Sequence, residues 1–483
     1  MFALSPVFYI VGIMLTILAA AMAVPALVDL IAGYADWQIF GASALVTLFC
    51  GVSIMLTTQG KRTTALNLRQ AFLLTTLIWT VVAVFGALPF AFSDLKLSYT
   101  DAFFEAMSGV TTTGSTVIVG LDHAPPGLLL WRALLQWLGG IGIVVMAMGL
   151  LPMLSVGGMQ LFKTEAFDTP EKVLPRAARF AGWLSVIYVG ITLLCALALY
   201  FAGMSGFDAV AHAMTTIATG GYSTKDASVG HFDNPTIDWI VTIGMLLGSL
   251  PFIAYLKMLR GDSRMLLHDS QIRWFLWIAV LASMAAAIWQ VFTLNEHPLD
   301  ALRHGFFNCV SVMTGTGFAT TDFGQWGGFA MAQMLVLMFI GGCAGSTTCG
   351  IKIFRVQIAY ATARAQMGRL LRPHGVFIPY YNKKPVPEEV SNAVMGFLVV
   401  YMLCFLVLAM VLGALGLDFV TAVSGAATAI SNVGPGLGDI IGPAGNFAPL
   451  PDAAKWALSL AMLMGRLELF TVLILLAPSF WRG

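Results

Sequence analysis

The sequence predicts an all-α polytopic membrane protein in which four pseudo-fourfold helix–pore loop–helix repeats surround a central pore, with two additional N-terminal helices. Three observations support this fold. Hydrophobic residues make up 58% of the 483 residues and charged residues only 10%, whereas soluble domains carry about 25% charged residues. Apolar runs near the ~20 residues needed to span a bilayer recur along the chain. Four intervals between these runs contain the same short pattern.

The apolar runs define the expected order of elements. Runs long enough to cross a membrane lie at 6–32, 39–57, 70–92, 128–155, 180–202, 236–258, 273–293, 329–350, 392–415 and 454–477. Shorter runs, which predict re-entrant segments, lie at 101–113, 208–219, 300–316 and 418–433. The first run is longer than the core of a signal peptide and no basic region precedes it, so we expect a retained helix.

These runs divide the chain into an N-terminal helix pair, four repeats and one linker. The helix pair is expected at 1–57, the repeats at 70–155, 176–259, 272–368 and 391–477, and a basic cytoplasmic linker at 369–390. Nineteen of the 25 Lys and Arg residues fall in alternate loops or at the C-terminal end. The positive-inside rule then predicts a multi-pass protein with both termini in the cytoplasm.

Each repeat contains an aspartate, a short apolar stretch and a glycine-rich turn. The aspartates are Asp101, Asp208, Asp300 and Asp418, and the turns end at Gly114, Gly220, Gly317 and Gly434. The intervals from aspartate to glycine are 13, 12, 17 and 16 residues. Four such patterns, each between two long apolar runs, indicate an internal repeat.

The chemistry of this pattern favours a cation. An Asp at the start of a short helix caps its free N–H groups, and the opposite end carries roughly half a negative charge. Glycine adopts backbone angles that let consecutive carbonyls face one axis. Such oxygens replace the hydration shell of an ion. The alternative, four turns that only connect helices, requires neither the capped short helix nor the shared register.

The chain resembles the Trk/Ktr/HKT superfamily of potassium transporters over residues 70–477. Within it the TrkH/TrkG branch is most similar, through the helix pair at 6–57, the segment Ile430 to Gly436 and the segment Met464 to Glu468. The resemblance implies a filter of backbone carbonyls at Thr112, Thr113, Gly114, Ala218, Thr219, Gly220, Gly315, Thr316, Gly317, Asn432, Val433 and Gly434. Glycine at all four key positions implies potassium preference. K⁺ is then the transported ion, and no other cofactor is expected.

The eighth apolar run contains a second candidate site. Four glycines lie within residues 341–350, and each costs up to about 1 kcal/mol relative to Ala inside a helix, so we expect the helix to break there. The resemblance implies an intramembrane loop that gates the pore below the filter. Its residues are Gly341, Gly342, Gly345, Ser346, Thr347, Thr348 and Gly350. The alternative is a face of small residues for close helix packing.

Two charged residues within apolar segments are further candidates, Arg466 and Glu105. Arg466 is in the last run, where a central charge costs about 2.5–3.5 kcal/mol. The resemblance implies that it is a barrier to cations below the filter. The alternatives are snorkelling to the inner surface and an ion pair with Glu468, although residues two apart on a helix face different ways. Glu105 either adds negative potential or accepts a hydrogen bond from a neighbour.

The predicted function is channel-like potassium uptake across a bacterial inner membrane. The membrane potential supplies about 2.3 kcal/mol per charge per 100 mV, enough to accumulate a cation. The resemblance also implies a homodimer and a cytosolic TrkA-type nucleotide-binding ring. This chain has no GxGxxG or Walker motif, so any control by nucleotides is expected to come from such a partner. The basic linker is expected to contact this ring or membrane lipid headgroups, and no nucleic-acid partner is expected. The alternatives are a proton- or sodium-coupled symporter and a membrane-embedded enzyme, the latter disfavoured by the absence of catalytic spacings.

Overall fold

The computed structural model describes residues 4–59, 67–149, 158 and 173–482. Within these residues the chain is almost entirely helical, and its only strands are the two-residue pair β1 (Tyr380–Tyr381) and β2 (Lys384–Pro385). Seven of the described helices are long and apolar enough to cross a membrane, or nine if two bent pairs each count as one span. The predicted all-α polytopic fold is confirmed.

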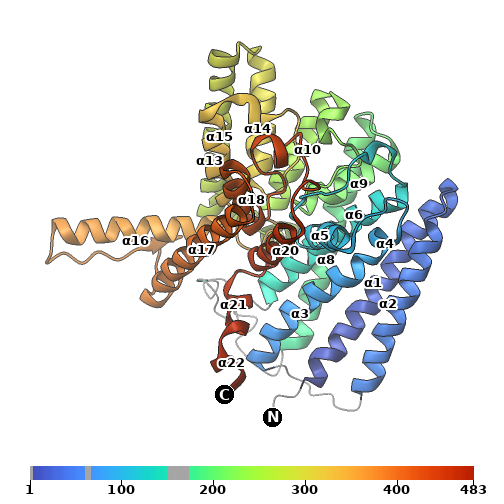
Figure 1. Ribbon diagram of the computed structural model, residues 1–483. Coiled ribbons are helices and arrows are strands. Elements are labelled where there is room, and N and C mark those ends of the chain that lie inside the picture. Colours follow the sequence, from blue (N-terminus) through green and yellow to red (C-terminus); the bar gives the residue numbers. More distant parts are fainter. Residues whose placement is uncertain (1–3, 60–66, 150–157, 159–172, 483) are drawn as a thin grey trace.

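The N-terminal pair consists of α1 (Ser5–Ala32) and α2 (Trp37–Thr58), which pack along each other at one side of the molecule (Figure 1). Only α1 packs extensively on the repeats, against α3 and α6. The carboxylate of Asp29 in α1 accepts a hydrogen bond of 2.6 Å from the amide of Gly127, in the first turn of α6. A carboxylate is favourable at a helix N-terminus, so this contact fixes the pair to the first repeat.

The four repeats follow in chain order. The first contains α3 (Leu68–Gly86), α4 (Leu88–Phe92), α5 (Tyr99–Val110) and α6 (Pro126–Gly149). The second contains α8 (Val173–Phe201), α9 (Gly206–Ile217), α10 (Pro235–Ser249) and α11 (Phe252–Leu259). The third contains α13 (Ser270–Trp289), α14 (Pro298–Met313), α15 (Gly328–Phe339) and α16 (Ile353–Leu371). The fourth contains α17 (Glu388–Ala414), α18 (Phe419–Ser431), α20 (Asp452–Arg466) and α21 (Phe470–Leu476).

Short elements connect these helices. They are η2 (Leu121–His123), η6 (Ser228–Phe232), α12 (Arg264–His268), the π-helical turn η7 (Gln290–Leu294), η8 (Phe323–Trp326), α19 (Gly438–Ile441) and α22 (Pro478–Arg482). The four predicted re-entrant segments are the helices α5, α9, α14 and α18, each of 12 to 16 residues. We call these the pore helices.

Three predicted spans are not continuous helices. The break in 329–350 was expected and is confirmed, because α15 ends at Phe339 and α16 begins at Ile353. The runs 236–258 and 454–477 each form two helices at an angle, α10 and α11 at 91° and α20 and α21 at 117°. Pro251 causes the first bend, because the residue before a proline is driven to an extended conformation, as Leu250 is. The end of the run 128–155 lies outside the described residues.

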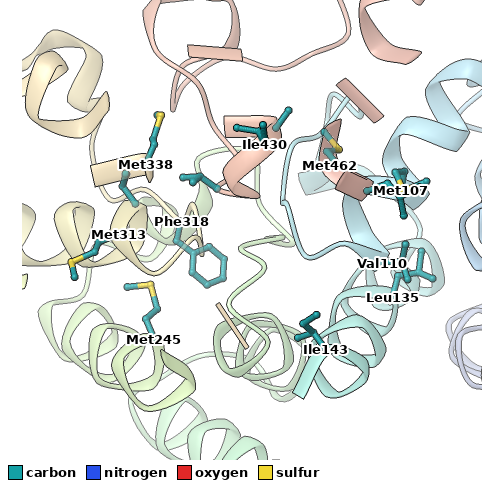
Figure 2. Packing of buried hydrophobic residues seen from close by; sticks show 14 of the residues in the cluster. Met107, Val110, Leu135, Ile143, Met245, Met313, Phe318, Met338, Ile430 and Met462 are labelled. Atoms are coloured by element: carbon teal, nitrogen blue, oxygen red, sulfur yellow. The ribbon is translucent and has the colours of Figure 1, made fainter. Parts of the chain in front are cut away.

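The core is one contiguous cluster of buried apolar side chains to which all four repeats contribute. Figure 2 shows this cluster, with Met107 from the first repeat, Met245 from the second, Met313 from the third and Ile430 from the fourth. In contrast, α16 projects away from this bundle (Figure 1). The predicted basic linker, residues 369–390, begins in the last turn of α16 and contains the hairpin β1–β2.

Candidate cation filter and gate

The pore helices begin with caps that differ from the predicted ones. Asp418 does cap α18, accepting the amide of Thr421 at 3.1 Å. In the first two repeats the cap is a serine three residues earlier, Ser98 or Ser205, and the aspartate accepts that serine's hydroxyl at 2.8 Å. Asp300 lies in the first turn of α14, which has no side-chain cap. The prediction of aspartate caps was therefore right only in the fourth repeat, although all four carboxylates lie at a helix N-terminus, where they are favourable.

The C-terminal ends of the pore helices share one backbone geometry. One residue in each repeat adopts positive φ: Thr112 (52°), Thr219 (51°), Gly315 (69°) and Asn432 (54°). The amide of the next residue then bonds at 2.8 to 3.1 Å to the carbonyl oxygen five residues back, on Ser108, Thr215, Ser311 or Thr428. This is the Schellman pattern of helix termination. It defines the register of the four repeats residue by residue.

This register corrects the predicted filter in the second repeat. Counting from Thr219, the residue equivalent to Gly114, Gly317 and Gly434 is Gly221, which also has positive φ (76°). The prediction named Ala218, Thr219 and Gly220, one residue too early. We therefore take 112–114, 219–221, 315–317 and 432–434 as the candidate filter segments, and call them the filter segments below. The interval from Asp208 to this glycine is then 13 residues, as in the first repeat.

The four filter glycines form a closed ring. A Cβ on Gly114 would lie 2.2 Å from the carbonyl oxygen of Gly220 in the next repeat. In the same way, a Cβ on Gly221 would lie 1.7 Å from Thr316 O and a Cβ on Gly317 would lie 2.1 Å from Val433 O. A Cβ on Gly434 would lie 3.0 Å from Thr113 O, which brings the series back to the first repeat. Each glycine thus permits the approach of the adjacent repeat's carbonyl, and its positive φ disfavours any L side chain as well.

Glycines on the following helices bring the pore-helix ends close to the ring. A Cβ added to Gly139 would lie 1.9 Å from the carbonyl oxygen of Val110. A Cβ on Gly248 would lie 2.7 Å from that of Ile217, and a Cβ on Gly465 would lie 2.1 Å from that of Ile430. These three carbonyls occupy the same register position, two residues before the positive-φ residue. Because α6, α10 and α20 contact the last turn of their own pore helices, the negative ends of the helix dipoles are fixed beside the filter segments.

Side chains also join the fourth repeat to the first. Asn432 Nδ2 donates to Thr113 Oγ1 and to the carbonyl of Met462, both at 2.8 Å. Ser115 Oγ donates to the carbonyl of Gly434 at 2.7 Å. At the N-terminal end of the first pore helix, Lys455 Nζ contacts Asp101 at 2.5 Å. These contacts close the ring between segments more than three hundred residues apart.

Residues 340–352, which we call the gate loop, fold without helix between α15 and α16. The amide of Thr347 donates to Gly248 O at 3.1 Å, and its hydroxyl donates to Gly248 O at 2.9 Å and Ile217 O at 3.1 Å. Thr219 Oγ1 in turn donates to Thr347 Oγ1 at 3.1 Å. The gate loop therefore contacts both the end of a pore helix and a filter segment.

The other predicted gate residues form the turn of this loop. Ser346 Oγ lies 2.7 Å from Thr348 Oγ1, which accepts the amide of Gly342 at 3.1 Å. Gly345 and Gly350 have positive φ, and a Cβ on Gly341 would lie 1.9 Å from Cys349 O. The glycines thus serve tight turns within the loop, whereas the alternative interpretation required a continuous helix with a small-residue face.

Arg466, the last residue of α20, joins this loop to the first repeat. Its Nη1 donates to the carbonyl of Thr347 at 3.0 Å and contacts Cys349 Sγ at 2.8 Å, and its Nη2 donates to Gly139 O at 2.9 Å. The side chain is 1% exposed. The alternative of an ion pair with Glu468 is wrong, because among the described residues Glu468 pairs with Arg355 of α16.

Sequence reasoning did not identify three buried basic residues around this site, Arg132, Lys352 and Arg355. Arg355 and Lys352 lie at the base of the gate loop. The guanidinium of Arg355 lies 3.8 Å from the centre of the Phe397 ring, and Lys352 donates to the carbonyl of Thr348. Glu105 accepts Arg132 Nε at 2.8 Å and the amide of Val117 at 2.9 Å, so it is a structural acceptor. For Glu105 the structure thus shows the second predicted alternative, a hydrogen-bond acceptor. The available signal for Arg132 was a charged residue in an apolar run.

The described residues contain no group of three His, Cys, Asp or Glu side chains that could hold a metal ion. The six cysteines, all within the described ranges, are free. The polar groups that meet at the ring are backbone carbonyls and hydroxyls. Carbonyl oxygens are the ligands that selective monovalent-cation channels use.

A helical bundle with four pseudo-equivalent re-entrant helices and a ring of glycines and carbonyls defines a membrane protein of the cation-transport class. The family model described as "TrkH: Cation transport protein" matches residues 36–482. The chain therefore belongs to the TrkH family.

Individual relatives are similar to this chain over nearly its whole length. The chain is 45% identical to the Trk system potassium uptake protein TrkI of Halomonas elongata, over 99% of this chain and 97% of that protein. It is 39% identical to the Trk system potassium uptake protein TrkH of Escherichia coli K12, over 98% of each. The crystal structure of the potassium transporter TrkH from Vibrio parahaemolyticus matches with a TM-score of 0.92 and 38% identity over 100% of both chains.

Proposed function

We propose that this chain takes up potassium ions across a bacterial inner membrane through the ring of filter segments, in a channel-like manner. The ring of glycine–carbonyl contacts is the observation that carries the proposal, because it repeats around all four repeats and closes on itself. Four backbone segments that approach so closely offer oxygens to a dehydrated monovalent cation. The names of the relatives support potassium as that cation.

The gate loop is the proposed gate. It lies against the filter segment of the second repeat through Thr219 and Thr347, and the buried guanidinium of Arg466 holds it to α6. A buried positive charge opposes the passage of a cation. Opening then requires the hydrogen bonds of Arg466 to the loop to break, so the arrangement in this structure corresponds to a closed gate.

The projecting helix α16 is the proposed route for control by a cytosolic partner. It begins directly after the gate loop and leads to a surface on which Arg364, Arg369, Arg372, Lys383 and Lys384 are all exposed. A TrkA-type nucleotide-binding ring bound there would move the base of the loop. A homodimer of this chain would present two such helices to the ring.

Growth rescue and flux measurements test the proposal. Expression in a bacterium that lacks potassium uptake should restore growth at limiting potassium, and the purified protein in proteoliposomes should pass rubidium when an inside-negative potential is imposed. A correctly inserted protein that stays inactive both with and without a co-expressed regulatory ring would refute potassium uptake. Rubidium accumulation driven by a pH or sodium gradient at zero potential would instead show a coupled symporter.

A further inference from the structure

We propose that Gln136 of α6 is a positioning residue that fixes the filter segment of the second repeat and so contributes to the choice between potassium and sodium. The inference rests on the proposed function. Gln136 is fully buried and belongs to the first repeat, whereas the segment it holds belongs to the second. It was not among the residues that the sequence predicted for the site.

A single carboxamide holds the backbone on both sides of the filter glycine. Gln136 Nε2 donates to the carbonyl oxygen of Gly220 at 2.5 Å, and Gln136 Oε1 accepts the amide of Tyr222 at 3.0 Å. Gly221 lies between these two bonds. The oxygen that contacts Gly114 in the ring is the same Gly220 oxygen that accepts this hydrogen bond. Its position is therefore set by Gln136.

The sequence of the second filter segment fits this carboxamide. A Cβ on Gly220 would lie 2.4 Å from Gln136 Cδ. The equivalent positions in the other repeats hold Thr113, Thr316 and Val433, which have side chains. The second repeat has two consecutive glycines for two different reasons. Gly221 admits the carbonyl of the next repeat, and Gly220 admits Gln136.

Arg132, one turn earlier on α6, extends the same attachment. Residues four apart on a helix lie on one face, and Arg132 Nη1 donates to Ser223 O at 2.7 Å while its guanidinium lies 4.0 Å from the centre of the Tyr222 ring. In the third repeat the support comes from the repeat's own pore helix, where Ser311 Oγ donates to Phe318 O at 2.6 Å. In the fourth repeat, Gly434 O accepts both Thr428 Oγ1 of its own pore helix at 3.0 Å and Ser115 Oγ of the first repeat at 2.7 Å. The second filter segment is thus held from a neighbouring repeat.

The hydrogen bond from Gln136 affects selectivity because it fixes the position of the Gly220 carbonyl oxygen. A potassium-selective ring must keep its oxygens at the separation that suits the larger ion. Without the donated hydrogen bond, the Gly220 carbonyl is free to move toward a smaller ion. One such bond corresponds to a change of about tenfold in an equilibrium ratio. We expect loss of the carboxamide to lower potassium-over-sodium discrimination by about this factor, with a smaller effect on maximal flux.

The test compares Gln136→Met with Gln290→Met in proteoliposomes. Methionine keeps the length of the side chain without its hydrogen bonds. Gln290 is a matched control because it is also fully buried and donates within its own helical segment, to Ala286 O at 3.2 Å. Rubidium flux is measured against increasing sodium. Gln136→Met should lose about tenfold in discrimination, and Gln290→Met should retain it.

A second variant serves if Gln136→Met does not assemble. Gly220→Ala leaves the glutamine in place and pushes its carboxamide away, so it should lower discrimination by a similar factor. Wild-type discrimination in a transporting Gln136→Met or Gly220→Ala protein would overturn the inference while leaving the proposed function intact. Absence of rubidium flux in the unmodified protein would instead overturn the proposed function.

Discussion

Replacing each glycine of the Gly220–Gly221 pair by alanine provides the most direct check of the filter register. In the predicted register Gly220 is the filter glycine, whereas the backbone geometry places Gly221 there. The two residues are adjacent and chemically identical. Their alanine variants therefore differ in what the added methyl group meets and in the backbone φ at which it is placed.

The structure predicts a large difference between the two variants. At Gly221 the Cβ would lie 1.7 Å from Thr316 O, and φ is 76°. Backbone atoms do not yield as a side chain does, so the ring must open by more than an ångström, and the left-handed conformation adds about 1–2 kcal/mol. A displacement of about 1 Å at a functional site is enough for a hundredfold loss of rate. At Gly220 the Cβ meets the end of the Gln136 side chain, which can turn aside.

The assay is rubidium uptake in proteoliposomes, normalised to the amount of inserted protein and measured with and without competing sodium. Gly221→Ala should reduce flux at least a hundredfold, and Gly220→Ala should retain most of the flux with weaker discrimination. Gly203→Ala is a control for alanine at positive φ, because this glycine also has positive φ but no atom lies within 4 Å of its Cβ position. If Gly220→Ala abolished flux and Gly221→Ala did not, the assignment of Gly221 as the filter glycine would be refuted.

Three further predictions follow from the buried charges. Arg466→Met removes the bonds from α20 to Thr347 and Gly139, so rubidium flux without any cytosolic partner should rise severalfold; unchanged or lower flux in a well-inserted protein would argue against the gate. Glu468→Gln leaves the Arg355 guanidinium buried without its carboxylate, which costs about 3–5 kcal/mol. The thermal midpoint should fall, and adding Arg355→Met should restore part of it; no recovery would mean that the two residues act separately. Burial and the nearby Asp94 raise the pKa of Asp36, between α1 and α2, above its usual value of 3.8. The folded state therefore loses stability as pH rises from 3.8 through the raised pKa of Asp36. Asp36→Asn should raise the thermal midpoint at about pH 8 more than at about pH 4; an equal shift at both pH values would contradict the raised pKa of Asp36.

Sequence reasoning located the repeats because their signals are local. A short apolar run followed by Gly114, Gly317 or Gly434 is visible without coordinates. The one-residue error in the second repeat arose because both Gly220 and Gly221 satisfy that pattern. The positive φ of Thr219 and Gly221, and the contact of Gly221 with Thr316 O, distinguish them. Composition alone does not determine backbone register.

The remaining errors involve partners that are distant in sequence. The break at residues 341–350 was predictable because glycines weaken a helix locally. The bend after Arg466 was not, since Glu468 and Leu469 adopt positive φ in a segment without glycine or proline, where Arg355 of α16 binds Glu468. The role of Gln136 was equally hidden, because a lone glutamine in an apolar run has no characteristic spacing.

The closure of the ring between Gly434 and Thr113 has a consequence for biosynthesis. Ribosomes release the chain from its N-terminus, and early parts of a long protein fold while later parts are still being made. The first filter segment cannot make all its contacts until the last repeat has been synthesised, because Gly434, the neighbour of Thr113, lies 321 residues downstream. A chain truncated before the fourth repeat therefore inserts several helices into the membrane but has no complete ion site. The set of four filter segments is therefore complete only when the last repeat has been made.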